Sequence, residues 1–233
     1  MLYTNFGYGS DTRVALNSPI IGYLSSSRYF LDSTDKILGR ELNAEQLSAY
    51  LTFRSTLYDT IPEYAFIEAL RNYVQHRELP IHNITYHNYI EDSNSHTTSD
   101  MVVSLSLTAS KETLAKDKKF KKAVLNALDD RINIVRCIRH HMGGLWALHD
   151  YLLKNHSDIP IASRNLVADT IATFGQQSTE DTIGLYAIVY ESENEIAEKV
   201  PLLLDWDDAR LEAIRRLGNL KSLHRCYVSG KNK

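Results

Sequence analysis

Three polar side chains near the end of a predicted helix could form a catalytic set, or could simply be the polar edge of a packed helix. Arg71 and Asn72 are followed by His76 in the stretch ALRNYVQHRELP. An imidazole exchanges protons near neutral pH, and a guanidinium stabilises an anionic phosphate. At about 100° per residue, Asn72 and His76 fall on one flank of the helix and Arg71 points to roughly the opposite side. Arg71 can therefore join His76 only through its length, a bent helix end or a second protomer.

The helix that must position these residues has clear boundaries in the sequence. Thr60, Pro62 and Glu63 are typical of a helix start, with a capping threonine and a proline in the first turn, and Pro80 ends the pattern. Apolar residues recur between them at the three-and-four spacing of a buried stripe. We therefore predict a helix over about 61–78. Near its C-terminus, His76 could also be a simple helix cap, with Arg71 in solvent.

The rest of the first two-thirds of the chain is also mainly helical in pattern. After a poorly patterned start, residues 25–41 favour a helix, and Asn43 with Gln46 predicts a capping box at the start of the next one. The β-branched content of the following stretch predicts an inserted β-hairpin at about 81–109. The lysine-rich segment 111–122 then predicts a helix that ends near residue 129 or 130.

A longer helix is predicted through residues 132–153, where Gly143 and Gly144 could kink it or allow a close approach. The stretch SDIP at 157–160 marks a boundary, beyond which helical and strand-like patterns alternate. We therefore predict a mainly α protein, with a helical domain over 1–157 and a small α+β appendage over 158–233.

Length, composition and charge favour an ordinary soluble protein. The chain has 233 residues, 43% hydrophobic, and a net charge of −3. This balance argues against capture of nucleic acid by charge alone, although segment 111–122 carries six lysines. No apolar run reaches the length of a membrane span, and the N-terminus lacks the pattern of a secretory signal. Cys137 and Cys226 are typical of free thiols. We expect a cytoplasmic protein without membrane contact.

The Arg71-Asn72-x-x-x-His76 pattern resembles the R-x4-6-H motif of the HEPN superfamily. The resemblance covers about residues 28–155 as helical architecture and is specific over about a dozen residues around the motif. It implies a HEPN-like helical bundle, an RNA substrate and, for many members, a metal-independent endoribonuclease of toxin or antiviral-defence type without a cofactor. Two motif copies usually meet across a homodimer there. An antitoxin or sensor partner is also compatible with the resemblance.

The resemblance also implies a role for each residue of the motif. His76 would act as general base or general acid, Arg71 would stabilise the phosphorane, and Asn72 would orient the histidine or the phosphate. The products would be a 2′,3′-cyclic phosphate and a 5′-hydroxyl. The HxY extension of toxins silenced by nucleotidylation is absent, because Arg77 and Glu78 follow His76.

Other interpretations of the sequence stay open. Arg136 and His141 repeat the R-x4-H spacing, but Cys137 stands where a polar residue is expected. A non-catalytic HEPN-like module that holds RNA or a protein is the main alternative to an enzyme. A metal-dependent hydrolase would have to use the hairpin histidines, namely His82, His87 and His96. On a helix, His140, His141 and His149 point in different directions and do not favour a metal site.

Overall fold

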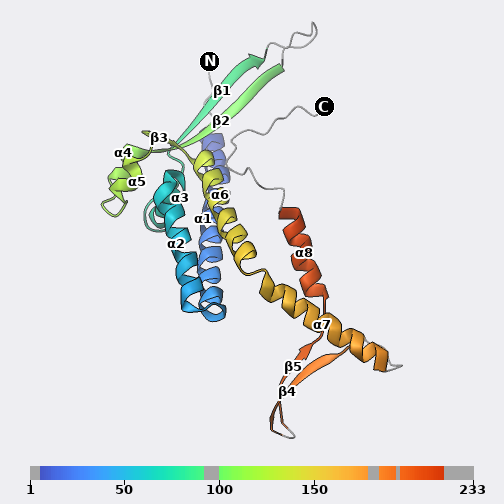
Figure 1. Cartoon of the computed structure of the whole chain (residues 1–233). Helices are drawn as coiled ribbons and strands as arrows, with labels where there is room; N and C mark the ends of the chain where they lie inside the picture. The colour runs from blue at the N-terminus through green and yellow to red at the C-terminus, as the bar shows by residue number, and fades with distance from the viewer. Residues whose placement is uncertain (1–5, 92–99, 178–183, 193–194, 218–233) are drawn as a thin grey trace. The chain divides into compact units, whose positions relative to one another are not determined.

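The chain is mainly helical and carries small antiparallel sheets (Figure 1). The computed structural model describes residues 6–91, 100–177, 184–192 and 195–217. Their contacts form two compact units, which divide between Leu148 and His149. No helix within these described residues is long and apolar enough to cross a membrane.

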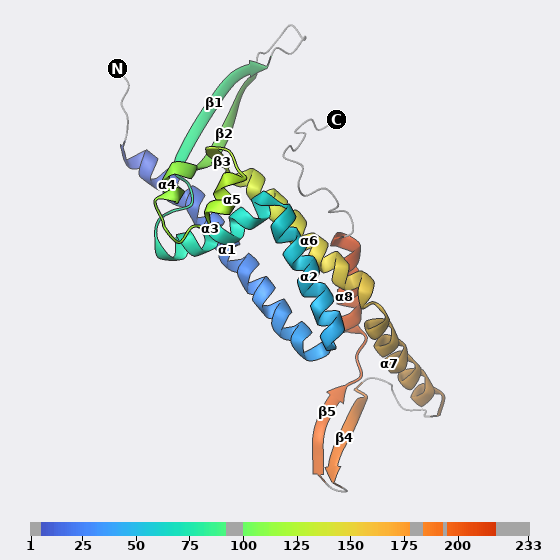
Figure 2. The same cartoon turned by 60° about the vertical axis from the view of Figure 1, so that its left-hand side comes forward.

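The first unit is built on long helices that run alongside one another in both views (Figures 1 and 2). The third of them occupies the middle of the packing: it contacts the first two helices, and the start of α6 bonds to it. The elements of this unit, in chain order, are α1 (Phe6–Glu41), α2 (Ala44–Thr60), α3 (Pro62–His76), β1 (Asn83–Glu91), β2 (Asp100–Ser110), α4 (Lys111–Ala115), α5 (Lys122–Asn126), β3 (Arg131–Asn133) and the part of α6 (Ile134–Asn155) that ends at Leu148.

Helix α1 begins much earlier than the sequence pattern predicted and contains Pro19 in its interior. A proline there removes one backbone hydrogen bond, so the helix must be held by packing. Ile20 and Leu24 on either side of the next turn are buried in the core. Asn17, also buried, accepts a hydrogen bond from the backbone N–H of Ile81 at 3.0 Å. Tertiary contacts thus extend a helix whose local sequence is a poor helix former.

The capping box predicted at the start of α2 is present, whereas the threonine cap predicted for α3 is not. Asn43 Oδ1 accepts from the N–H of Gln46 at 2.9 Å, and Gln46 Oε1 accepts from the N–H of Asn43 at 3.2 Å, which confirms the capping box. Thr60 does not cap α3. It is the last residue of α2, and its hydroxyl donates to the Thr56 carbonyl, so Ile61 takes the cap position without a side-chain bond.

The predicted hairpin is confirmed, and it is joined by a strand that the sequence did not indicate. β1 and β2 pair antiparallel, with Asn83 opposite Thr108, and β3 pairs with the end of β2. β3 is three residues long, too short to produce a readable alternation. Its central residue, Ile132, is buried beside Leu107 and Ala109 in the core. The predicted turn between the two long strands lies outside the described residues.

The lysine-rich segment is not one helix. It forms two helices of five residues, α4 and α5, separated by a turn. The Asp117 carboxylate accepts from the N–H of Lys119 at 3.0 Å, and Phe120 is buried against Phe66 and Tyr73. The buried aromatic ring fixes the turn to the core, because continuing the helix would carry it elsewhere.

Helix α6 runs without a break through Gly143 and Gly144. The two glycines have different surroundings. A Cβ atom on Gly143 would meet nothing within 4 Å, whereas a Cβ on Gly144 would lie 2.4 Å from Cδ2 of Tyr64. Of the two roles predicted for the glycine pair, a kink or a close approach, Gly144 has the second. The group that approaches it is the aromatic ring of Tyr64 in α3.

The second unit is an α+β arrangement by itself, composed of α7 (Asp158–Gln177), β4 (Tyr186–Ser192), β5 (Glu195–Pro201) and α8 (Asp205–Leu217). β4 and β5 form an antiparallel pair. Arg164 of α7 bonds to Asp207 and Asp208 of α8, each at 2.8 Å. No described side chain of this unit is buried.

Candidate active site

The predicted catalytic residues occupy the last two turns of α3. Asn72 and His76 are exposed, and Arg71 is half-buried. Nη1 of Arg71 donates to Oδ1 of Asn72 at 3.0 Å, while Nε of Arg71 is buried and makes no hydrogen bond. The structure thus joins Arg71 to Asn72. No described bond joins either residue to His76 within the chain.

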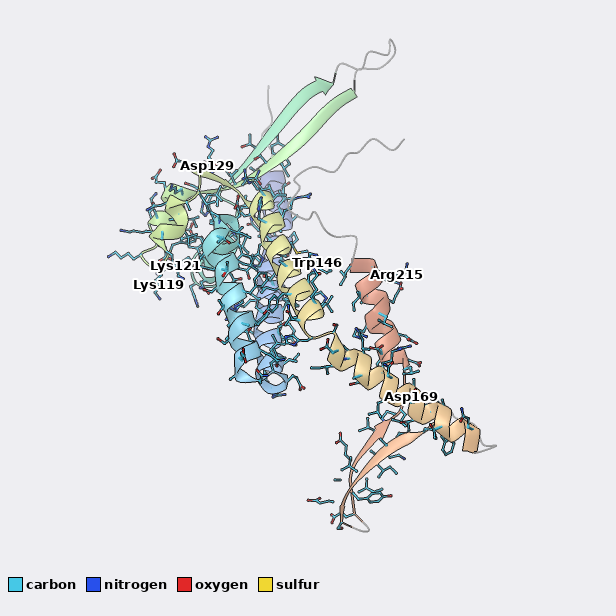
Figure 3. All side chains as sticks on the ribbon, viewed as in Figure 1. Lys119, Lys121, Asp129, Trp146, Asp169 and Arg215 are labelled. Carbon is cyan, nitrogen blue, oxygen red and sulfur yellow. The ribbon has the colours of Figure 1, made fainter. Side chains whose placement is uncertain are left out.

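Asn72 and His76 line one small groove of about 100 Å³ together with Lys119 and Lys121. A wider hollow of about 530 Å³ on the other side of His76 is lined by Lys116 and Lys118. These lysines lie in the turn that follows α4, and Figure 3 shows Lys119 and Lys121 beside α3. Segment 111–122, some forty residues further along the chain, therefore surrounds the candidate histidine with cations.

Acidic groups balance part of this charge. The Asp117 carboxylate pairs with Arg77 at 3.5 Å. The hydroxyl of Tyr73 donates to Glu78 at 3.3 Å. Burial, followed by the nearby charge of Glu78, raises the pKa of Tyr73 to about 12, so its hydroxyl stays neutral and serves as a donor.

The two residues of the second R-x4-H pair, Arg136 and His141, lie in different environments. Arg136 is 58% exposed and forms an ion pair with Glu63 of α3 at 3.1 Å. His141 is fully buried. Each side chain of the pair thus has its own partners, and His141 is enclosed by protein.

His141 is the centre of a buried polar network. Its Nδ1 lies 2.6 Å from the Tyr23 hydroxyl, and its Nε2 lies 3.1 Å from Glu68 Oε1. Each ring nitrogen of His141 therefore has one hydrogen-bond partner. The Tyr64 ring packs on the imidazole with centroids 4.5 Å apart. Arg28 extends the network, at 3.6 Å from Glu68.

The network lowers the pKa of Glu68 and raises the pKa of Tyr23. Burial alone would raise the pKa of Glu68, but the hydrogen bond and charge of His141, with the charges of Arg28 and Arg54, outweigh burial and lower it. Glu68 is therefore a carboxylate at neutral pH. Burial, with the charges nearby, raises the pKa of Tyr23 well above its ordinary value, so that this phenol stays a donor.

Tyr64 and Glu68 were not predicted as site residues, although the sequence contains a signal for them. Tyr64, Glu68, Asn72 and His76 recur at intervals of four residues, which places them along one flank of α3. We call these four residues the α3 row. The sequence alone does not single out this row as a site, because Tyr64 fits the apolar stripe of the helix and Glu68 fits a charge in solvent.

The hairpin histidines give no support to a metal-dependent hydrolase. His82 Nδ1 accepts from the backbone N–H of Ser110 at 2.9 Å, which is a structural role. His87 stands opposite Ser104 in the β1–β2 register. His96 lies outside the described residues. Among the part of the chain that the structure describes, no cluster of three or more His, Cys, Asp or Glu side chains could hold a metal ion.

Comparison of the chain with protein-family models, with curated proteins and with solved structures found no match.

Proposed function

We propose that the chain is a metal-independent endoribonuclease whose site is Arg71, Asn72 and His76. The observation that supports this proposal is the groove in which Asn72 and His76 lie with Lys119 and Lys121. Lysines bind the phosphates of a nucleic acid without reading its sequence. A proton-exchanging side chain beside such cations is suited to cutting a phosphodiester.

The chemistry follows from the ribose 2′-hydroxyl. His76 takes its proton, the 2′-oxygen attacks the adjacent phosphorus, the bond to the 5′-oxygen breaks, and that oxygen takes up a proton from water to become the 5′-hydroxyl. Arg71 stabilises the doubly charged phosphorane, and Asn72, to which Arg71 is bonded at 3.0 Å, orients the guanidinium. The products are a 2′,3′-cyclic phosphate and a 5′-hydroxyl. DNA lacks the nucleophile and should not be cut.

The proposed site is composite across a homodimer. Arg71 and His76 lie five positions apart, so about 500° of helical rotation, or 140° after one full turn, separates their directions. The Arg71 guanidinium is engaged with Asn72 rather than with its own His76. A second copy of α3, packed against the first, would bring an arginine of one chain to the histidine of the other.

The proposal is tested by incubating total RNA and tRNA with the purified full-length protein in excess EDTA. Wild type should cut RNA and leave cyclic-phosphate ends. His76→Ala should lose activity by about 10²–10⁴-fold, and Arg71→Ala by about 10²–10³-fold. Gln75→Ala is the matched control, since Gln75 is an exposed neighbour on the same helix.

The role of the lysines is tested with two further variants, one inside the groove and one outside it. Lys121→Gln should weaken cleavage by raising KM, whereas Lys122→Gln, on an exposed residue outside the groove, should not. Equal cleavage by wild type and both motif variants would refute the site, and loss of cleavage in EDTA would refute a metal-independent reaction. RNA binding without cleavage by any variant would favour the non-catalytic binding module.

A further inference from the structure

A second and larger groove, of about 480 Å³, lies at the other end of the α3 row. We call it the Tyr64 groove. Its polar lining comes from α1, α2, α3 and the turn before α5, and consists of Arg28, Arg54, Ser55, Tyr58, Tyr64, Glu68 and Lys121. Lys121 also lines the groove of His76, so the two grooves share one cation.

The Tyr64 groove contains donors that the protein leaves unused. The Tyr64 hydroxyl is buried, with the residue 2% exposed, and has no hydrogen-bond partner among the described residues. Leaving a buried hydroxyl unpaired costs free energy, so a donor kept this way calls for an acceptor from outside the chain. Burial, together with the charge of Glu68, raises the pKa of Tyr64, which keeps the proton on this donor.

The cations of the groove also have donors to spare. Arg54 bonds to Asp35 through Nη1 and also hydrogen-bonds with Tyr50, and a guanidinium carries five N–H groups in all. Lys121 Nζ bonds to the Tyr58 hydroxyl at 3.0 Å, which uses one of its three N–H groups. The ion pair with Asp35 holds the Arg54 side chain in place before any ligand arrives.

The charge in the groove favours an anion. Three cations, Arg28, Arg54 and Lys121, line it with one carboxylate, Glu68. That carboxylate is already engaged by His141 at 3.1 Å and by Arg28 at 3.6 Å. Arg28 is also paired with Asp32, and Arg54 with Asp35, so among the described ion pairs Lys121 is the cation of the lining without a carboxylate. An incoming anion therefore meets the Lys121 ammonium first, with the two guanidinium groups held in place beside it.

We propose that the Tyr64 groove binds a phosphate group through Tyr64, Arg54 and Lys121. A phosphate offers more acceptor oxygens and more charge than a carboxylate, and Arg and Lys both recognise it. The site stands on its own donors and does not depend on nuclease activity. The phosphate has two possible sources: a backbone phosphate of RNA, or a small phosphate ester. From His76 to Tyr64 the helix rises about 18 Å, a span that a short RNA strand can cover.

Inorganic phosphate is the probe for the site, with acetate as the competing anion. Calorimetric titration of the full chain should detect phosphate binding that is tighter than acetate binding. Tyr64→Phe, which removes one oxygen atom, should weaken phosphate binding by about tenfold, since a hydrogen bond to a charged group is worth about that factor. Tyr29→Phe is the matched control, because Tyr29 is an exposed tyrosine of α1 outside the groove.

Lys121→Gln provides an independent variant on an exposed residue, and it too should weaken phosphate binding. Glu68→Gln should strengthen binding, because it removes the one negative charge of the lining. Absence of phosphate binding by the folded wild type, equal binding of acetate, or unchanged affinity in both Tyr64→Phe and Lys121→Gln would overturn the proposal.

The source of the phosphate is distinguished with a fluorescent RNA oligonucleotide on the His76→Ala variant, which keeps the Tyr64 groove. Competition between RNA and inorganic phosphate, with weaker RNA binding after Tyr64→Phe, would assign the site to the RNA backbone. Phosphate binding that RNA leaves unchanged would assign it to a small ester. Because neither readout requires cleavage, failure of the nuclease proposal and failure of the phosphate site are separable.

Discussion

Replacing Gly144 with alanine should destabilise the first unit, whereas the same change at Gly143 should stabilise it. The two glycines are adjacent in α6 and make a matched pair. A Cβ on Gly144 would lie 2.4 Å from Cδ2 and 2.7 Å from Cε2 of Tyr64, whereas a Cβ on Gly143 would meet nothing within 4 Å. The same added methyl group is thus a clash at one position and harmless at the next.

The magnitude follows from two opposing effects. A glycine-to-alanine change inside a helix contributes about 1 kcal/mol of stability at either position. At Gly144 the Tyr64 ring must also move by about 1 Å to reach the 3.4 Å of ordinary contact. Tyr64 is 2% exposed and packs on the fully buried His141, so the ring has little room and the overpacking cost should approach about 3 kcal/mol. We expect Gly144→Ala to lose about 2 kcal/mol and Gly143→Ala to gain about 1 kcal/mol.

Urea unfolding followed by circular dichroism measures both variants against wild type. The expected gap of about 3 kcal/mol corresponds to several degrees in Tm for a unit of this size. Equal stability of Gly144→Ala and Gly143→Ala would refute the packing of Tyr64 against α6. Because that packing also positions the Tyr64 hydroxyl, Gly144→Ala should weaken phosphate binding as well.

Three further predictions concern charges and assembly. The pKa of Glu68 is lowered on folding, so the ionised carboxylate contributes to stability above its ordinary pKa of 4.5, and this contribution is lost as the pH falls below that value. The unfolding free energies of wild type and Glu68→Gln should therefore converge on acidification. A constant difference between them would contradict the His141 network. Arg136→Gln removes an ion pair whose arginine is 58% exposed and whose glutamate is 13% exposed, and it should cost about 1 kcal/mol of stability without affecting RNA cleavage. Loss of cleavage would instead move the site to Arg136 and His141. Mixing inactive Arg71→Ala and His76→Ala chains should restore cleavage by forming one intact composite site per dimer, and an inactive mixture with proven subunit exchange would argue for a site within one chain.

Local signals in the sequence predicted those parts of the fold that local physics controls. The capping box at Asn43, the span of α3 and the alternation of β1 and β2 depend on residues a few positions apart. The early start of α1 and the short β3 depend on the core instead. Pro19 argues against a helix locally, and only the burial of Ile20 and Leu24 explains why the helix continues through it.

The candidate site shows the same limit. Its three motif residues are readable because they lie on one helix, and the lysines of 111–122 are readable as a charged segment. The proximity of the lysines to the motif cannot be predicted from the sequence. The turn at Phe120 that brings Lys119 and Lys121 to His76 depends on burial of an aromatic ring against α3. A lysine-rich stretch predicted as one helix would have given no reason to place its cations at that end of α3.

The two R-x4-H pairs show why spacing alone does not define a site. Both lie on helices, and both place a histidine five positions after an arginine. Burial then separates them: His76 is exposed beside lysines, while His141 is enclosed and has a partner on each ring nitrogen. An imidazole that serves as base must reach the substrate, so accessibility favours the first pair. The second histidine instead holds Tyr23 and Glu68 together, and through the packing of Tyr64 on its ring it shapes the far end of the α3 row.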